Sequence, residues 1–476
     1  MEFYLAPVGR GKTDAVLARI LEAKARSPFG SVWVLLATNR QTLDFRRRLL
    51  TVTPDERVFF NIETFTFYGL YERLLMMAGK PQRRLSDSAR MTLIGEILRD
   101  LAEHGELPIF EPIAHTPGLA RILLNFIYEL KQSLIDVDVF SDAARRLNLP
   151  KAVELARIYE AYQQILIQHD LVDREGEGWL ALSALAEDPS LGTSIELMVC
   201  DGYDQFNLLQ ARLLVQLSTR ARENLTTLTT VPDREDTVGL RFKRALERLI
   251  ACCGEENVYP DLHWELFNTD ALPRPGGEPL FGLAEGLFHP TAKPITVSTD
   301  VVTRIEAPDP TTESAALMRR VKKLLLNHES PESILIAVRD MERYHQPLRT
   351  AARRYGIPIA MRGDPMIENP AIASLVSLLD LRAADFPRPD LLDVLASPYT
   401  SAGFTTDDVD RLDQQARAAY VTGGRAELIG CIRALPLEAL TDADDDDDHE
   451  AVPAPLDETS AAALRERLTH FFDGIT

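Results

Sequence analysis

The chain has 476 residues, 45% of them hydrophobic, which is enough to bury the cores of about two to four globular domains. Its formal net charge of −20 argues against nonspecific nucleic-acid binding by the surface as a whole. The four cysteines lack metal-ligand spacing, so we expect reduced thiols in a cytoplasmic protein: Cys200, Cys252, Cys253 and Cys431. The apolar runs are only of strand length, and the N-terminus leads directly into one of them, so neither a membrane span nor a signal peptide is predicted.

The N-terminal region alternates short apolar runs with helical patterns. Strands are predicted at 3–5, 31–37 and 58–60, with a helix reaching about Ala25 and another starting near Thr42. This alternation predicts a parallel sheet with right-handed crossovers. Residues 76–190 have apolar positions at helical spacing and no strand-like run, which predicts a helical insertion. Strands at 195–200 and 225–231 then complete the sheet, so the first domain comprises residues 1–75 and 191–255.

The second half repeats the α/β pattern once. Residues 256–300 are rich in proline and glycine and predict a linker or surface loop. Residues 301–370 predict the start of a second α/β domain, with strands at 301–306, 333–338 and 357–361 and helices at 312–327 and 341–355. Residues 371–476 predict a helical insertion, with a final helix from near Thr459. Within it, segment 438–458 contains ten acidic residues and no Lys or Arg, which favours disorder.

A phosphate-binding loop is predicted after the first strand. The segment Ala6-Pro7-Val8-Gly9-Arg10-Gly11-Lys12-Thr13 lies between a strand and a helix, with Ala6 where the common form has glycine. The glycines would let backbone N–H groups turn toward phosphate oxygens, Lys12 would supply a charge, and Thr13 a hydroxyl for Mg²⁺. The alternative is a chance match in a tight strand–helix turn. The prediction is therefore a site for ATP and Mg²⁺.

Asp201 follows the apolar run 197–200, where an acid that holds Mg²⁺ through water would lie. The alternative is that Asp201 and Gly202 only form a turn, for which Asp-Gly is well suited. Arg339 ends the predicted strand 333–338 and is a candidate contact for the γ-phosphate, with an ordinary surface residue as the alternative.

These motifs together resemble those of a known family. The form AxxGxGKT resembles that of UvrD-type superfamily 1 helicases, and segment 64–67 resembles their third nucleic-acid motif. Residues 201–210 align with their D-E-x-Q-D-x-x-x-x-Q block, while 334–340 and 356–358 resemble motif IV and the "gIP" after it. The variant D-G-[FY]-x-x-F-x-x-x-Q is similar to that of AddB-type subunits of the bacterial AddAB helicase–nuclease, which works in double-strand-break repair and recombination.

The resemblance implies an α/β P-loop NTPase with two RecA-like parallel-sheet domains and helical insertions. It implies that ATP and Mg²⁺ are bound by the loop, by Asp201 on the metal side, and by Gln210 and Arg339 near the γ-phosphate: Ala6, Gly9, Arg10, Gly11, Lys12, Thr13, Asp201, Gln210 and Arg339. It also implies a path for single-stranded DNA along Thr38, Asn39, Arg40, Thr64, Phe65, Thr66 and Phe67. For Phe65 and Phe67 the alternative is core packing. The implied partners are single- or double-stranded DNA and an AddA-type subunit, with no membrane.

Departures from the family pattern indicate weak or absent hydrolysis. Gly202 replaces the glutamate that acts on the attacking water, and loss of such a group costs about 10²–10⁴ in rate. We find no GDxDQSIY coupling block after Gln210, no motif V or VI, and no nuclease motif with its cluster-binding cysteines. The chain is then a fragment, a truncated product or a stand-alone relative. The alternative functions are an active DNA-dependent ATPase or helicase, a scaffold with a vestigial loop, and an unrelated P-loop kinase.

Overall fold

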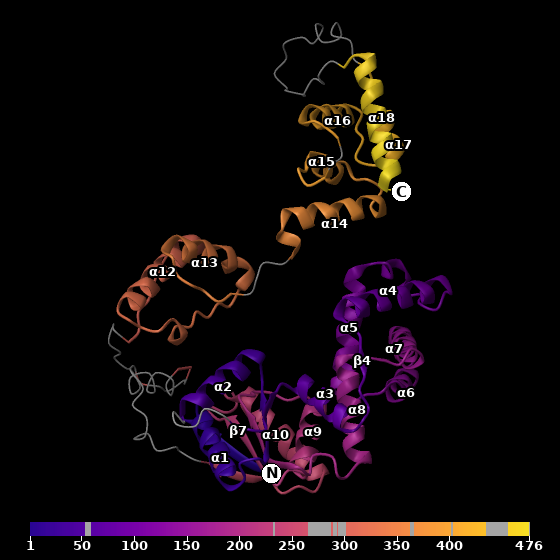
Figure 1. Cartoon of the computed structure of the whole chain (residues 1–476). Helices are drawn as coiled ribbons and strands as arrows, with labels where there is room; N and C mark the ends of the chain where they lie inside the picture. Colours follow the sequence, from indigo (N-terminus) through magenta and orange to yellow (C-terminus); the bar gives the residue numbers. More distant parts are fainter. Residues whose placement is uncertain are drawn as a thin grey trace. The chain divides into compact units, whose positions relative to one another are not determined.

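A computed structural model describes residues 1–52, 59–231, 234–264, 287–288, 293, 301–361, 366–400, 403–434 and 456–475. The chain divides into two compact units, Met1–Thr303 and Arg304–Thr476, shown from indigo to yellow in Figure 1. Among the described residues, all the strands that pair into sheets belong to the first unit.

A six-stranded parallel sheet forms the centre of the first unit (Figure 1). Its order is β3-β2-β6-β7-β1-β8, with every neighbouring pair parallel. The strands are β1 (Glu2–Ala6), β2 (Ser31–Leu36), β3 (Ile62–Phe65), β6 (Ile195–Asp201), β7 (Glu223–Thr229) and β8 (Asp261–Trp264). The predicted parallel sheet, assembled from two distant parts of the chain, is confirmed.

Helices cover both faces of this sheet, which explains why its strands β2 and β6 are mostly apolar. One face packs against α1 (Lys12–Arg26) and α2 (Asn39–Val52). The other face packs against α3 (Phe67–Met77), α8 (Arg174–Glu187), α9 (Leu208–Ser218) and α10 (Leu240–Glu255). The result is an α/β fold consistent with a RecA-like fold.

The segment predicted as a helical insertion is helical. Its core comes chiefly from α4 (Asp87–Glu103), α5 (Pro117–Gln132) and α7 (Pro150–Gln168). A 3₁₀ turn (Glu111–Ile113) and α6 (Val137–Leu147) complete it. Two details differ from the prediction. A two-stranded ladder joins β4 (Arg83–Arg84) to β5 (Leu171–Val172), and α8 packs into the core beneath the central sheet.

Three boundaries in the first unit correct the sequence-based expectations. The strand predicted at 58–60 is β3, which starts later because Asn61 has a left-handed φ of 54° and interrupts the extended run; residue 58 lies outside the described part. Helix α2 starts at Asn39 because the Thr38 carbonyl and hydroxyl accept the first turn's N–H groups from Thr42 and Gln41. Within the predicted linker 256–300, β8 adds an edge strand beside β1.

The second unit begins with two helices, α12 (Pro310–Leu326) and α13 (Met341–Tyr355), which share a core. Tyr344 Oη donates to Glu313 Oε2 (2.7 Å) and Arg319 Nη1 donates to Tyr355 Oη (3.3 Å), so the two helices run in the same direction. A 3₁₀ turn lies between them at Pro331–Ser333.

The three strands predicted in this region are not formed by the described residues 301–361. Ile334, Ile336 and Val338 pack against the α12–α13 core while Leu335 is 77% exposed, which is the alternation of an extended segment with one covered face. A strand also requires a hydrogen-bonded neighbour, and no ladder pairs these described segments. The second parallel sheet therefore stays a prediction.

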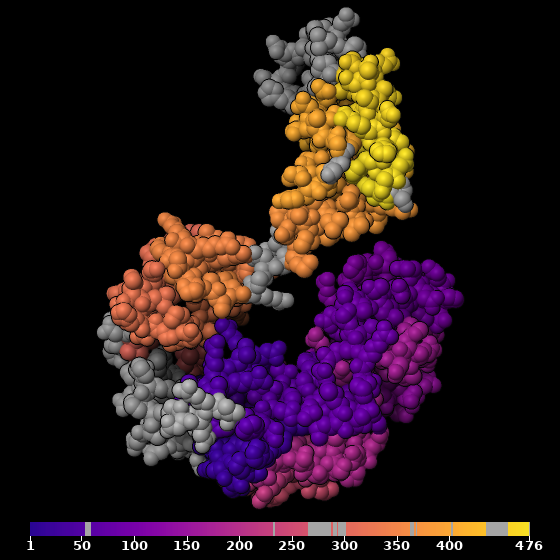
Figure 2. Space-filling model, in the orientation of Figure 1, coloured from indigo at the N-terminus to yellow at the C-terminus, as the bar shows by residue number. Residues whose placement is uncertain are grey.

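The remaining described helices form a bundle around a separate core, drawn orange to yellow in Figure 2. They are α14 (Pro370–Ala383), α15 (Arg388–Ala396), α16 (Thr406–Ala418), α17 (Arg425–Gly430) and α18 (Glu458–Ile475), preceded by a 3₁₀ turn at Met366–Glu368. The described residues of 370–434 and 456–475 are thus mainly helical. Most of the acidic segment 438–458 lies outside the described residues. Among the described helices, none combines the length and apolar character needed to span a membrane.

Candidate nucleotide-binding site

The predicted site residues of the first unit gather at one edge of the sheet. Because all six strands are parallel, their carboxyl ends lie at the same edge, where α/β proteins bind ligands. The loop after β1, the Thr38 segment after β2, the Thr66 segment after β3 and Asp201 at the end of β6 all lie there. The positions of these segments in the sequence did not by themselves establish that they lie close together in space.

The loop after β1, predicted to bind phosphate, has a backbone that turns at two glycines. Gly9 and Gly11 both have a left-handed φ of 78°, which favours glycine. Gly11 is also the N-cap of α1 and has no side chain to occupy the first N–H groups of the helix. An uncapped helix N-terminus with its positive dipole end is suited to an anion such as phosphate.

Lys12 lies across this loop. Its Nζ donates to the carbonyl oxygens of Ala6 and Pro7, both at 2.9 Å. Burial lowers the pKa of Lys12 to about 8, although the nearby Asp201 carboxylate acts in the opposite direction. The ammonium group is therefore held inside the loop close to the helix N-terminus.

Asp201 connects the loop to the sheet. It is 5% exposed, and its Oδ2 accepts a hydrogen bond from Thr13 Oγ1 at 2.9 Å. Its Oδ1 accepts from Thr227 Oγ1 on β7. The two predicted metal-side residues, Thr13 and Asp201, are thus brought together from 188 residues apart, whereas Thr227 was not singled out from the sequence.

Gly202 has a structural reason to be glycine. Its φ is 78°, and a Cβ atom there would lie 3.1 Å from the Gln41 side-chain nitrogen. The following Tyr203 donates from its hydroxyl to the Leu36 carbonyl (2.9 Å), which ties the end of β6 to the end of β2. The backbone at position 202 is therefore shaped for glycine and not for the glutamate of active helicases.

We expect Gly202→Ala to lower the free energy of unfolding by about 1–2 kcal/mol, the usual cost of a left-handed non-glycine residue. The matched control is Gly95→Ala, because Gly95 lies within α4 with open space around its Cβ position. That change should stabilise the protein by about 0.5–1 kcal/mol through helix propensity. Denaturant unfolding measures both variants, and equal effects would contradict the strain assigned to position 202.

For the other predicted nucleotide contacts, the structure gives less direct support than for Lys12, Thr13 and Asp201. Gln210 lies in the first turn of α9, where its side chain and that of Asn207 form a capping box (3.2 and 2.8 Å). Arg339 is exposed and lies in the second unit, just before α13. Ala6 is fully buried at the end of β1, and Arg10 is half-buried in the loop. Roles for Gln210 and Arg339 at a γ-phosphate stay predictions.

The predicted DNA-contacting residues divide into exposed and buried groups. Thr38, Asn39 and Arg40 are exposed at the start of α2. Thr64 accepts a hydrogen bond from Arg46 Nε at 2.8 Å. Half-buried Thr66 is the N-cap of α3.

The two phenylalanines of this segment differ. Phe65 is half-buried and packs edge-on against Trp33, with ring centroids 5.3 Å apart. Phe67 is only 3% exposed and contacts Tyr203 and Phe206 (5.1 and 6.2 Å between centroids). For Phe67 the structure therefore corresponds to the core-packing alternative, because a buried ring cannot stack on a base. The contact also joins two sequence motifs, 64–67 and 201–210, that lie far apart in the chain.

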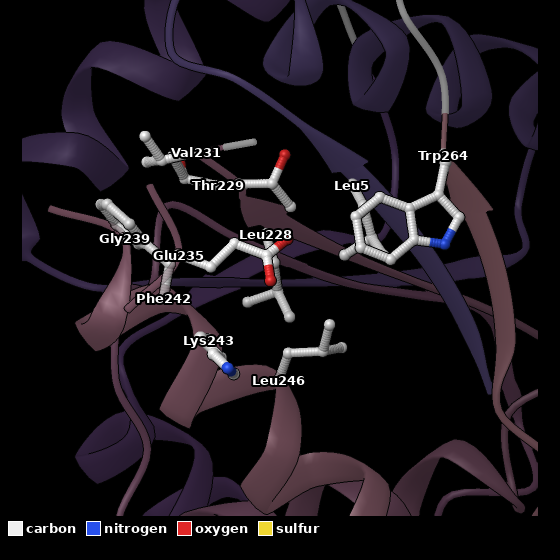
Figure 3. Close-up of a pocket in the computed structure, with 11 residues that line it drawn as sticks. Leu5, Leu228, Thr229, Val231, Glu235, Gly239, Phe242, Lys243, Leu246 and Trp264 are labelled. Atoms are coloured by element: carbon white, nitrogen blue, oxygen red, sulfur yellow. The ribbon is translucent and has the colours of Figure 1, made fainter. Parts of the chain in front are cut away.

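A small apolar cavity lies on the α10 side of the sheet (Figure 3). Its volume is about 60 Å³, and its apolar lining includes Leu5, Leu228, Phe242 and Trp264. Ligand pockets usually measure about 300–1,000 Å³, so this cavity is too small for a nucleotide. The loop after β1 is the better candidate site.

Comparison with known proteins agrees with this architecture. The α/β fold with its parallel central sheet defines a protein consistent with the RecA-like class. The family described as "ADDB, N-terminal" matches residues 3–259, more than half of the 476 residues. The chain belongs to this family, as the motifs of the sequence predicted.

Individual relatives are distant, and each is named as the B subunit of an ATP-dependent helicase/deoxyribonuclease. The relative from Thermoanaerobacter sp. (strain X514) is 24% identical over 443 residues, covering 89% of this chain and 37% of the relative. The one from Clostridium novyi (strain NT) is 25% identical over 378 residues, 76% of this chain and 32% of that protein. The Bacillus subtilis (strain 168) protein is 24% identical over 242 residues, 48% and 20% of the two chains. The matched part of the chain thus covers 37%, 32% and 20% of the length of these three relatives.

Proposed function

We propose that this chain is the helicase-like region of an AddB-type subunit of a cytoplasmic helicase–nuclease that acts in DNA repair and recombination. In this proposal it binds ATP and Mg²⁺ through the loop after β1 and hydrolyses ATP weakly or not at all. The observation that carries the proposal is the arrangement of Gly11, Lys12, Thr13 and Asp201 at one sheet edge. The family match and the names of the relatives support the role in a helicase–nuclease.

Each side chain has a chemical task in nucleotide binding. The N-terminal amides of α1 would bind phosphate oxygens, and Lys12 would exchange the Ala6 and Pro7 carbonyls for the β- and γ-phosphates. Thr13 donates its proton to Asp201, which leaves its oxygen lone pairs for Mg²⁺. Asp201 would accept hydrogen bonds from the water that surrounds the ion.

Weak hydrolysis is the expected consequence of Gly202. It provides no side chain to orient or deprotonate water, and the left-handed backbone there disfavours any residue that could. The protein would then retain nucleotide without useful turnover, while an AddA-type partner supplies the motor.

A DNA path is proposed over the same sheet edge. Arg40 and Arg47 are exposed on α2, so they can meet phosphates even though the chain carries a net charge of −20. The hydrogen bond from Arg46 to Thr64 joins α2 to the 64–67 segment. Thr38, Asn39 and Phe65 complete the proposed contacts with single-stranded DNA.

Titration with a fluorescent ATP analogue and Mg²⁺ tests nucleotide binding. We expect Lys12→Ala to weaken affinity about 100-fold or more, because charge-assisted contacts to phosphate are lost. Lys151→Ala, an exposed lysine on α7, is the matched control and should bind like the wild type. Affinity should also fall as the pH rises through about 8, where Lys12 of the free protein loses its proton, and Lys12→Ala should lack this step.

Two results would overturn the proposal. Unchanged affinity in Lys12→Ala, or no binding by the wild type, would mean that the loop is a vestigial part of a scaffold. Turnover of many ATP molecules per second with single-stranded DNA would instead identify an active helicase motor.

A further inference from the structure

We propose that Thr227 is a positioning residue, which holds the Asp201 carboxylate in the orientation that Mg²⁺ binding requires. This inference rests on the proposed function and adds a residue that the phosphate-loop motif does not contain. Thr227 lies on β7, between the strand that ends in Asp201 and the strand that leads into the loop.

Thr227 lies beside Asp201, the predicted metal-side acid, on the neighbouring strand of the sheet. β7 pairs with β6 through Thr226 and Cys200, so the next residue on each strand, Thr227 and Asp201, are neighbours. Thr227 is 2% exposed, and its hydroxyl donates to Asp201 Oδ1. On the other oxygen, Oδ2, Asp201 accepts from Thr13 at 2.9 Å. The carboxylate is therefore held at both oxygens, once from the sheet and once from the loop.

Two anchors on two oxygens fix the rotation of a carboxylate about its Cβ–Cγ bond. An ionised carboxylate has about four lone-pair positions, and the two hydroxyl donors occupy two of them. The remaining positions would be able to accept hydrogen bonds from metal-bound water. With only Thr13 in place the group could rotate, and its buried Oδ1 would lose its donor.

The residue type at 227 also argues for a specific role. In a strand covered on both faces, valine has the same branched shape as threonine and needs no hydrogen bond. A buried hydroxyl at this position is favourable because Asp201 accepts from it. The neighbouring Thr226 is equally buried on the same strand, but its side chain points to the opposite face, as alternation along a strand requires.

The inference is tested by measuring affinity for a fluorescent ATP analogue with Mg²⁺ and again with EDTA. We expect Thr227→Val to bind about tenfold more weakly than wild type with Mg²⁺, the equivalent of one hydrogen bond to a charged group, and within about twofold of wild type in EDTA. Thr227→Ser keeps the hydroxyl and should retain most of the Mg²⁺ effect. Thr226→Val is the matched control and should behave like the wild type in both conditions.

The outcomes separate this inference from the proposed function. If wild type binds and Thr227→Val keeps the full Mg²⁺ effect, or loses affinity equally with Mg²⁺ and EDTA, Thr227 has no positioning role while the nucleotide site stands. If the wild type binds under neither condition, the proposed function is wrong, and the role of Thr227 is wrong with it. If Thr227→Val does not fold, loss of the Mg²⁺ effect in Thr227→Ser overturns the inference, and its retention supports it.

Discussion

Lys131→Met is expected to lower the free energy of unfolding of the first unit by about 3–5 kcal/mol, because it leaves a buried carboxylate without its cation. Lys131 Nζ lies 2.7 Å from Asp173 Oδ2, and the side chains of both residues are 3% exposed. Methionine has a similar length and apolar stem, so the loss of charge dominates the effect. Asp173 would keep only neutral donors, the Tyr162 hydroxyl and the Gly176 N–H.

Tryptophan fluorescence during denaturation measures this effect well. Trp33, Trp179 and Trp264 are the only tryptophans of the chain, and all three lie in the first unit. The control is the double variant Lys131→Met with Asp173→Asn, which removes both charges and keeps a side chain able to cap α8. Replacement of a whole buried pair is often close to neutral, so the double variant should be more stable than Lys131→Met. A loss below about 1 kcal/mol in the single variant would contradict the interpretation.

The network around this pair joins the helical insertion to the domain that carries the candidate site. Lys131 is on α5, Asp173 caps α8, and α8 packs beneath the central sheet. Next to Asp173, Glu175 is buried, and burial raises its pKa to about 7, with the Asp173 charge acting in the same direction. The stability contributed by neutral Glu175 is present below its unfolded pKa and is lost as the pH rises through about 7. The junction thus combines a buried ion pair with a carboxyl group whose pKa is raised to about 7 by burial.

The features best predicted from the sequence are those encoded locally. The loop from Gly9 to Thr13 lies between β1 and α1, and all three fall within the first 26 residues. The whole pattern can therefore be recognised in a single sequence. Asp201 was recognised because an apolar run precedes it. The helical character of residues 76–190 was predicted because apolar positions recur there once every turn.

Features that depend on distant contacts were not predicted. Thr227 acquires its partner 26 residues away across the sheet, and Lys131 meets Asp173 over 42 residues. Strand β8 has four residues of mixed polarity at a sheet edge. Its composition does not indicate a strand, and only its pairing with β1 identifies it as one. The segments at 333–338 and 357–361 have strand composition, but composition does not supply the neighbouring strand that a ladder needs.

Phe67→Ala is expected to destabilise the first unit by about 3–5 kcal/mol, the usual cost of removing a buried phenylalanine ring. Phe67 is 3% exposed and packs against Tyr71, Tyr203 and Phe206, so the truncated side chain would leave a cavity in the main core. Phe60→Ala is the control, because Phe60 is 56% exposed at the other end of β3. That change should alter stability by less than about 0.5 kcal/mol. Tryptophan fluorescence during denaturation measures both variants.

Variants at the neighbouring Phe65 and Phe67 distinguish base stacking from core packing at this sheet edge. If Phe65 stacks on single-stranded DNA, Phe65→Ala should weaken DNA affinity by about 1–3 kcal/mol, the worth of one base–aromatic contact. Phe67→Ala should change affinity only in proportion to the fraction of protein it unfolds, because its ring faces Tyr203 in the core. A variant at 67 that stays folded yet loses DNA binding would show that this ring leaves the core when DNA binds. The stability of the 64–67 segment and its recognition of DNA would then be coupled through Phe67, since that ring connects the segment to the residues that follow Asp201 and Gly202.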